Sequence, residues 1–494
     1  MNIQDAKNFR GLNGAHLLEA LPLQGPALVM AAGPVDPAVS LLLMGALEGL
    51  RPDCMALASR AKRPQLRSAL RHLRAGGVLL YFPWPGGAKM QAQWPAGDGG
   101  GRVAAWLASA TKAPVLPLNV SASASLPGRL QLSAGRLLGA ARLAGYTDRG
   151  SLADYLRLRA WLLREKDGGA APRLSRKLSA PLASAIPPEL LEGELARMHP
   201  MQKLATLGTM QAWTAQAFEI PMILREIGRL REASFRAAGE GTGKPVDLDR
   251  FDQHYRQLFI WDSEARKVVG GYRMGCTDSI LKSYGPEGLY THSLLQMKKA
   301  LLEDFQPALE LGRSFVRPEY QRSYAPLMLL WKGIGAFVAR YPRYHRLFGV
   351  VSISDDYHPL SKELMVSFVK QRLYRGDMAR LARPRKPYAP AYMDRPVDDL
   401  TWRMGASMDE ISDWVQDLEK DGKGVPVLLR QYAQLGASFF GFNVDPEFGH
   451  VVDGILMVDL LETGTKILKR YLGEEGLKNF QAWHDPQAGE GAPI

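Results

Sequence analysis

Residues 224–275 read LREIGRLREASFRAAGEGTGKPVDLDRFDQHYRQLFIWDSEARKVVGGYRMG, and this stretch decides the fold. Apolar residues at 224, 227, 230 and 235 recur at helical spacing, which predicts an amphipathic helix that Gly239 ends. A polar loop with aspartates at 247, 249 and 252 follows. The runs Gln257–Trp261 and Lys267–Met274 then read as two strands joined by a turn. We therefore expect helix, loop, strand, turn and strand, in that order.

The charged and aromatic residues of this stretch stand in a particular order. Arg231 and Phe235 lie four residues apart on the predicted helix, Asp249 and Asp252 lie three apart in the loop, and Arg273 lies in the second strand. This order resembles the acyl-homoserine-lactone synthases. It resembles still more closely the ornithine-lipid N-acyltransferases and the hemolysin-like proteins of the same superfamily.

Three later segments extend the resemblance, so that it spans about residues 200–460. Glu310-Leu311-Gly312-Arg313 matches a Glu-x-x-Arg element of that family. The family's closing segments are matched by LFGVVSISDDY at 347–357 and VPVLLRQYAQLGASFFGFNVDPEFGHVVDGILMVDL at 425–460. The resemblance implies an α/β domain of the GNAT type, with a mixed sheet, over residues 201–472. The charged, mostly helical run at about 360–424 is expected to be an insertion between two core strands, and residues 473–494 are expected to be a frayed tail.

The resemblance also implies catalytic roles. Transfer of an acyl group to an amine needs a proton acceptor, and Glu310 is the expected general base, acting directly or through water. Arg313 completes the Glu-x-x-Arg element, and an ion pair between these two residues is the structural alternative. Ser354 and Tyr357 come close after a predicted strand and are expected to protonate the departing thiolate.

Two further groups of residues are expected to bind the reactants. The resemblance places the pantetheine arm of the acyl donor and its phosphate on a strand at 309–317 and at the start of a helix at 325–340, where amide groups bind anions. The expected donor-binding residues are Phe315, Val316, Arg322 and Ser323. The expected substrate-binding residues, ordered by Arg–carboxylate pairs, are Arg231, Phe235, Asp249, Asp252, Arg273 and Tyr357. A purely structural network of the same pairs is the alternative.

Residues 1–175 are predicted to form a separate α/β domain, followed by a linker at 176–200. Strand-like runs such as Ala27–Ala32 alternate with helix-like runs such as Pro37–Leu50, which implies a mainly parallel sheet. The order of these pieces resembles the lysophospholipid acyltransferases, particularly at His72–Met90 and Thr111–Val120.

The N-terminal domain lacks the side chain on which that chemistry depends. In lysophospholipid acyltransferases a histidine, followed shortly by an aspartate, deprotonates the acceptor hydroxyl. The matching stretch Ala31–Asp36 reads AAGPVD, without an imidazole, and the later block Phe82–Gly87 has no carboxylate. We therefore expect an inactive domain that packs, scaffolds or holds lipid.

Charge and composition limit the partners. The net charge of +12, from 62 Lys and Arg against 50 Asp and Glu, suits an acidic acyl carrier protein or an anionic lipid surface. Aromatic residues do not alternate with basic ones as in a base-stacking surface, so we expect no nucleic-acid partner. Two distant cysteines give no metal-type spacing, so we expect no metal. A signal peptide and a membrane-spanning apolar run are both missing, which predicts a cytoplasmic chain capable of peripheral contact with the inner face of the membrane.

These observations together predict an enzyme. We expect it to move a 3-hydroxy fatty acyl group from acyl carrier protein to the α-amine of an amino acid, which the resemblance makes ornithine. Acyl carrier protein or coenzyme A carries the acyl group, and no other cofactor is expected. Two alternatives are a bifunctional N- and O-acyltransferase that makes the complete ornithine lipid, and a non-catalytic protein that binds lipid or acyl carrier.

Overall fold

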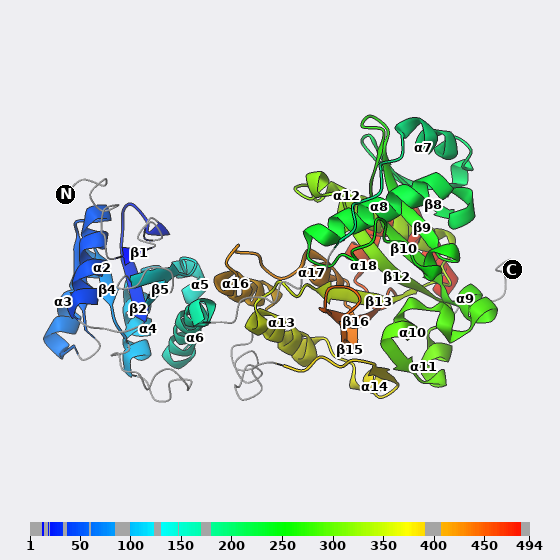
Figure 1. The fold of residues 1–494 in the computed structure, drawn as a ribbon. Coiled ribbons are helices and arrows are strands. Elements are labelled where there is room, and N and C mark those ends of the chain that lie inside the picture. Colours follow the sequence, from blue (N-terminus) through cyan, green and yellow to red (C-terminus); the bar gives the residue numbers. More distant parts are fainter. Residues whose placement is uncertain are drawn as a thin grey trace. The chain divides into compact units, whose positions relative to one another are not determined.

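The computed structural model describes residues 12–13, 18, 20–32, 37–58, 61–83, 99–122, 130–146, 148–168, 179–390 and 407–485. The chain divides into two compact units (Figure 1). The first contains Met1–Ala171, His358–Leu364 and Asp399–Val425. The second contains Pro172–Tyr357, Met365–Asp398 and Pro426–Ile494.

The first unit is built on a six-stranded sheet of order β1-β6-β5-β2-β4-β3. The central strands are parallel, as their alternation with helices predicts, whereas β5 and β6 pair antiparallel. The strands are β1 (Leu12–Asn13), β2 (Ala27–Ala32), β3 (Cys54–Leu57), β4 (Val78–Tyr81), β5 (Val115–Ala122) and β6 (Leu130–Ala134). The helices are α2 (Pro37–Leu50), α3 (Arg63–Arg74), α4 (Gly99–Thr111), α5 (Ala140–Leu143), α6 (Arg149–Gly168) and α16 (Met408–Leu418).

The likeness of this unit to lysophospholipid acyltransferases stays a prediction. Most of the stretch compared with the catalytic motif, residues 33–36, lies outside the described residues, as do residues 84–87 of the later block. What the structure does describe is a mixed sheet with a buried apolar core drawn largely from β2, β4, β5 and α2.

The second unit is built on an eight-stranded sheet of order β15-β16-β13-β12-β10-β9-β8-β7. Its strands are β7 (Lys203–Leu207), β8 (Met210–Gln216), β9 (Arg256–Asp262), β10 (Lys267–Cys276), β12 (Ala308–Val316), β13 (Arg346–Ile353), β15 (Ser438–Asp445) and β16 (Val451–Asp459). A small second sheet pairs β11 (Leu295–Met297) with β14 (Ala382–Pro384). The helix, turn and strand pattern expected around residues 224–275 is present as α8 (Pro221–Ala237), β9 and β10.

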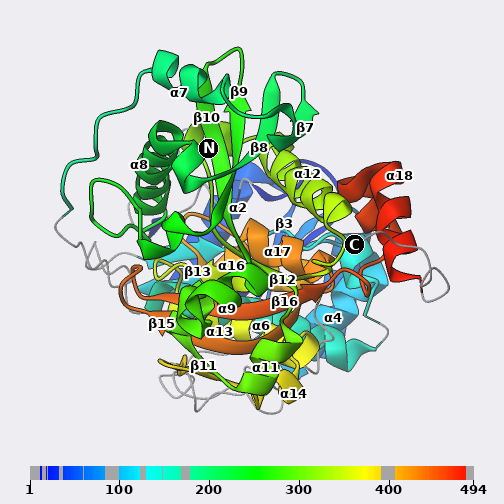
Figure 2. The ribbon, with the colours of Figure 1, turned by 90° about the vertical axis from the view of Figure 1, so that its right-hand side faces the viewer.

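The remaining helices surround this sheet. They are α7 (Pro188–Leu195), α9 (Thr277–Tyr284), α10 (Tyr290–Leu294), α11 (Lys299–Asp304), α12 (Ala325–Arg340), α14 (Gly376–Ala379), α17 (Val427–Gln434) and α18 (Thr465–His484), with a 3₁₀ turn η5 (Arg250–Gln253). Helix α13 (Pro359–Arg372) begins in the first unit and continues into the second from Met365. Helices α12 and α18 pack against each other (Figure 2). Across the described residues, no helix is long and apolar enough to cross a membrane.

One pair of strands departs from the otherwise antiparallel sheet. Strands β12 and β13 run parallel and pair only from Ala308–Leu311 to Arg346–Gly349. Beyond these residues β12 continues along β10, and β13 continues along β16. The two strands therefore part from each other in the middle of the sheet.

Three expected boundaries differ from the structure. Part of the predicted linker forms α7, where Glu194 accepts the backbone N–H groups of Met222 and Ile223 at 2.8 Å each and so caps the start of α8. Part of the predicted insertion, including α16, belongs to the first unit. Residues 474–484 of the predicted tail are helical in α18, after a kink at Gly473, and Phe480 there is buried.

Candidate active site

Arg231 ties helix α8 to the loop that follows it. The helical period places Arg231 on the same face as Ile227 and Phe235, and that face is buried. Its guanidinium donates to Asp252 Oδ1 and to Gln257 Oε1, each at 2.8 Å. Burial raises the pKa of Asp252, but the charges of Arg231 and Arg273 outweigh it and bring the pKa to about 2. The carboxylate is thus ionised at neutral pH, and its ion pair with Arg231 holds the loop against α8.

Arg273, on β10, is buried among aromatic rings. Its Nη1 donates to Asp249 Oδ1 at 2.6 Å and lies 3.4 Å from Asp252 Oδ2. Its Cζ lies 5.2–5.5 Å from the centroids of three rings, those of Phe251, Tyr255 and Tyr290. The Nε and Nη2 groups are buried and find no hydrogen-bond acceptor among the described residues. This arginine therefore retains donor groups that suit a carboxylate.

Arg313 sits on a bulge of β12. Two residues of β12, Arg313 and Ser314, stand opposite the single residue Tyr272 of β10, and Arg313 has a φ of 50°. Its Nε lies 3.2 Å from Asp247 Oδ2, and its Nη2 lies 3.5 Å from an oxygen of Asp249. Its Nη1 donates to the Tyr290 hydroxyl at 3.2 Å. The bulge thus aims the guanidinium at the loop after α8.

Glu310 is buried and accepts three hydrogen bonds. The donors are the Tyr255 hydroxyl, the Tyr290 N–H at 3.2 Å and the Thr291 N–H at 2.6 Å. The carboxylate therefore anchors the start of α10 to the sheet. The expected alternative, an ion pair between Glu310 and Arg313, is wrong, because Arg313 pairs with Asp247 and Asp249 instead. Burial raises the pKa of Glu310, and its hydrogen bonds act in the opposite direction.

A second acidic group of the sheet is buried on β16. Asp453 on β16 stands opposite Ser352 on β13, beyond the point where β12 and β13 part, and accepts the Ser352 hydroxyl at 2.8 Å. Burial and the nearby charge of Asp445 raise the pKa of Asp453 to about 7, although the hydrogen bond from Ser352 and the charge of Arg313 act against them. Burial and the charge of Asp453 likewise raise the pKa of Glu240 to about 8. Asp453 can therefore exchange a proton near neutral pH.

The loop between β15 and β16 covers this region. Phe448 on the loop lies with its ring 4.7 Å from the Arg313 Cζ, and it packs edge-on against Phe235 of α8. Asp445 lies 3.4 Å from the Tyr290 hydroxyl, which donates to it. A β-carbon on Gly449 would come within 2.5 Å of the Gly239 carbonyl oxygen, so the two loops are in close contact.

The predicted site residues divide into three sets. One set forms a network of ion pairs that also includes Asp247; its predicted members are Arg231, Asp249, Asp252, Arg273 and Arg313. Glu310 contacts Tyr255 and Tyr290, whose rings also lie near arginines of this network. Phe235 and Phe315 pack in an apolar core cluster. Ser354 and Tyr357 lie just past β13, where the Ser354 hydroxyl donates to the Ala238 carbonyl at 2.8 Å. The predicted roles of these residues stay predictions.

The predicted donor-binding residues lie at the end of β12 and in the turn before α12. Val316 ends β12 and pairs with Gly270 of β10. Arg322 and Ser323 are exposed in the turn before α12, and the Ser323 hydroxyl accepts the Ala325 N–H at 3.2 Å. The first turn of α12 thus begins beside these two residues, at the positions the sequence predicts.

The residue order gives no functional signal for Asp453, Asp445, Tyr290 or Glu240. Asp445 and Asp453 lie within the closing segment that carries the resemblance, but nothing in the residue order shows that Asp453 stands opposite Ser352. Only the pairing of β13 with β16 reveals this. Among the described residues, no cluster of three His, Cys, Asp or Glu side chains is placed to hold a metal ion.

Comparison with known proteins places these features in a family. Residues 230–332 match the model of the acetyltransferase (GNAT) domain. A glycine N(alpha)-acyltransferase of Bacteroides thetaiotaomicron is 32% identical over 284 residues, which are 54% of this chain and 83% of the relative. An L-ornithine N(alpha)-acyltransferase of Brucella abortus is 34% identical over 100 residues, which are 19% of this chain and 34% of the relative.

A solved structure of a CoA-dependent acyl-homoserine lactone synthase aligns with 54% of this chain and 97% of its own, at 12% identity and a TM-score of 0.26. That score is too low to support any conclusion about this chain. The relationship rests instead on the sequence identity, which extends over most of the length of the glycine relative. Together with the match to the GNAT model, it shows that the chain belongs to the GNAT acyltransferase family.

Proposed function

We propose that the chain transfers a fatty acyl group from an acyl-carrier thioester to the α-amine of an amino acid. The observation that carries the proposal is the parting of β12 and β13 beside a buried carboxyl group, Asp453, whose pKa is about 7. This arrangement offers an edge for an extended donor and a proton acceptor next to it. The names of the two relatives, both amino-acid N(alpha)-acyltransferases, support the same activity.

The acyl donor is assigned to the space between the parting strands. Past Leu311 and Gly349 the facing edges of β12 and β13 no longer pair with each other, so their backbone groups need other partners. The amides of a pantetheine arm can supply those partners in the manner of an added strand. The start of α12, beside Arg322 and Ser323, suits the phosphate of the arm because backbone N–H groups and the helix dipole favour an anion there.

The acceptor is assigned to the face that carries the arginine network. Its carboxylate is placed on Arg273, whose Nε and Nη2 find no acceptor among the described residues. The neutral amine nitrogen attacks the thioester carbonyl, so that a C–N bond forms, the C–S bond breaks and the pantetheine sulfur leaves as a thiolate. The amine proton passes to the Ser352 hydroxyl as that hydroxyl gives its own proton to Asp453. A base with a pKa near the working pH suits this task.

Glycine is the first acceptor to test, because the glycine relative is matched over 83% of its length. Ornithine, which the resemblance predicts, is the second, and it is supported by a match over 34% of the ornithine relative. Acyl carrier protein is proposed as the donor's carrier and coenzyme A as the alternative.

The test is an assay of the purified full-length chain with 3-hydroxyacyl-carrier protein or acyl-CoA and each amino acid in turn. We expect a product whose mass is that of the amino acid plus the acyl group, and its hydrolysis should release the acyl group only under amide-cleaving conditions. Formation of no N-acyl product with any α-amino acid would refute the proposal and favour a non-catalytic binding protein. A second, ester-linked acyl chain on the product would instead favour the bifunctional alternative.

A further inference from the structure

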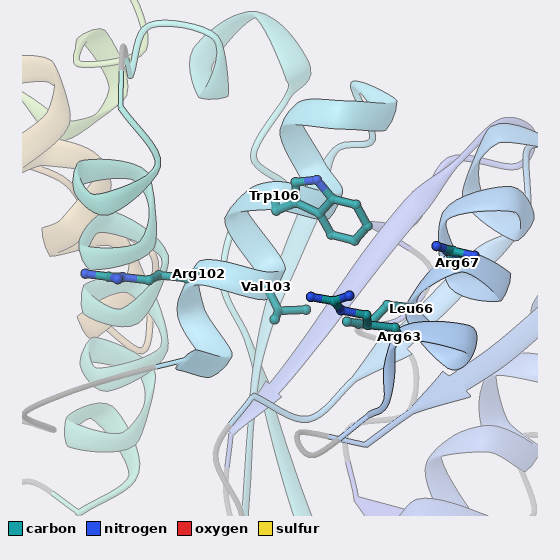
Figure 3. A pocket seen from close by; sticks show the side chains of 6 residues that line it. All are labelled: Arg63, Leu66, Arg67, Arg102, Val103 and Trp106. Atoms are coloured by element: carbon teal, nitrogen blue, oxygen red, sulfur yellow. The ribbon is translucent and has the colours of Figure 1, made fainter.

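The first unit contains a pocket of about 380 Å³ between helices α3 and α4. Its lining combines basic and apolar side chains, namely Arg63, Leu66, Arg67, Arg102, Val103 and Trp106. Figure 3 shows Leu66 and Val103 on the facing helices, with the Arg63 guanidinium between them and Trp106 above. The pocket therefore suits a molecule that has an anionic group next to an apolar part.

A stripe of arginines leads into this pocket along α3. Arg63, Arg67, Arg71 and Arg74 are all exposed, and helical geometry places the four within an arc of about 80°. Helix α3 carries no acidic residue at all. Among the described residues, no carboxylate pairs with any of these arginines or with Arg102. Like charges one turn apart destabilise a helix, so the stripe does not serve the folding of α3.

The stripe belongs to a basic part of the first unit. Residues 1–171 contain 20 Lys and Arg against 10 Asp and Glu, whereas the later segments 358–364 and 399–425 together contain 4 Lys and Arg against 8 Asp and Glu. A locally basic surface of this kind attracts an anionic surface from a distance.

We propose that the arginine stripe (Arg63, Arg67, Arg71 and Arg74) and the α3–α4 pocket bind an anionic phospholipid at a bilayer surface. The stripe contacts the phosphate groups, and one lipid places its glycerol and the start of its acyl chain against Leu66, Val103 and Trp106. A bilayer fits better than an acidic protein surface, because the apolar walls of the pocket need an apolar occupant beside the anion. Tryptophan is also favoured at the membrane interface, where its ring is partly apolar and partly wet. The inference is independent of the activity proposed for the second unit.

Co-sedimentation of the full-length chain with vesicles tests this site. One set contains phosphatidylcholine alone, and the other contains equal parts of phosphatidylcholine and phosphatidylglycerol. We expect binding to the second set only, with loss at high salt as the Debye length falls from about 10 Å at 0.1 M to about 3 Å at 1 M. Arg63→Glu with Arg67→Glu should weaken the partition coefficient at least about 25-fold, at about fivefold for each basic residue. Trp106→Ala should weaken it at unchanged charge.

The matched control is Arg225→Glu with Lys478→Glu, which makes the same change of charge at exposed positions of the second unit. Circular dichroism of each variant checks that it is folded. Equal binding to both vesicle types, or equal losses in the stripe and control variants, would overturn the site. Unchanged binding of Trp106→Ala would overturn the seating of a lipid in the pocket. Binding of acidic acyl carrier protein in place of vesicles, with the same sensitivity to Arg63 and Arg67, would assign the stripe to a protein partner instead.

Discussion

Arg313 adopts a backbone conformation that arginine rarely takes. A left-handed φ of 50° costs a residue with a β-carbon about 1–2 kcal/mol, so neighbouring contacts must hold it there. Asp247, Asp249, Tyr290 and the ring of Phe448 provide those contacts. Because such strain persists mainly where function requires it, the bulge itself indicates that the position of this guanidinium matters.

Replacement of Asp453 by asparagine tests whether this residue is the general base. If Asp453 accepts the amine proton, Asp453→Asn should lower kcat by about 10²–10⁴-fold with little effect on the KM for the donor. The wild-type kcat should rise with pH to a plateau above about 7, and that inflection should vanish in the variant. Steady-state kinetics between pH 5 and about 9 measure both effects.

The same substitution should stabilise the protein at alkaline pH. The pKa of Asp453 is raised from 3.8 to about 7 on folding, so the folded state binds this proton more tightly than the unfolded state. Its contribution is favourable below the unfolded pKa and is lost as pH rises through the folded one. One pKa unit corresponds to about 1.36 kcal/mol. The free energy of unfolding of Asp453→Asn, relative to that of the wild type, should therefore be up to about 4 kcal/mol higher at pH 8 than at pH 4. Normal turnover of the variant would remove Asp453 from the mechanism, and an unchanged pH dependence of unfolding would contradict its raised pKa.

Glu310→Gln distinguishes an anchor from a base. The amide can accept fewer hydrogen bonds than the carboxylate, so one of the donors from Tyr255, Tyr290 and Thr291 loses its acceptor. We expect a loss of about 1–3 kcal/mol in the free energy of unfolding, while the folded variant keeps most of its kcat. If Glu310 is the base, as the resemblance implies, kcat should instead fall about 10²–10⁴-fold. Denaturant unfolding and kinetics on the same preparation decide between these outcomes.

The sequence could indicate some of these residues and not others. Arg231, Asp249, Asp252 and Arg273 stand within a short segment whose order is informative, and the structure joins them as Arg–carboxylate pairs. Asp453 lies 101 residues from the serine it contacts, and that contact depends on strand order and register. The contact between Asp453 and Ser352 therefore follows from the pairing of β13 with β16, which residue types alone do not determine.

At the scale of elements, the parting of β12 and β13 depends on how closely the two strands approach at its start. A β-carbon on Gly349 would lie 2.2 Å from the Leu311 carbonyl oxygen, and the φ of Gly349 is 158°. Only glycine permits this approach. The resemblance implied the strand at 309–317 and the helix at 325–340, and both are present as β12 and α12. The sequence could not predict where the pairing of β12 with β13 stops.

Gly349→Ala should therefore disturb the donor side of the site. Since the atom it meets belongs to the backbone, the strands must move apart, and we expect a loss of at least about 1–3 kcal/mol in stability together with a raised KM for the acyl donor. Gly312→Ala is a suitable control, because a β-carbon there would meet no atom within 4 Å. Equal effects of the two alanine variants would mean that the close approach does not shape the donor site.

At the scale of the whole molecule, the first unit is not a contiguous stretch of sequence. Helix α16 belongs to it and packs on α6, with Ile411 and Trp414 fully buried. Asp413 on α16 pairs with Arg136 at 2.8 Å and also with Arg142. The alternation of strands and helices predicted the four strands β2, β3, β4 and β5, but not β1 or the antiparallel β6. The contribution of a segment more than 200 residues later had no local signal.

The buried pair of Arg159 on α6 and Asp417 on α16 tests that dependence. The guanidinium Nε donates to Asp417 Oδ2 at 2.6 Å, and both side chains are almost fully buried. Removing one partner of a buried pair typically costs about 3–5 kcal/mol, because the other charge is left uncompensated. Asp417→Asn should therefore destabilise the first unit by about that amount. The double variant Arg159→Met with Asp417→Leu should recover most of the lost stability. The control Asp421→Asn, at an exposed position, should have little effect. Hydrogen exchange of the α6 amides in the full-length chain measures each change.

A fragment of residues 1–175, which lacks α16, should unfold without cooperativity, whereas a sharp transition in that fragment would show that α16 is dispensable.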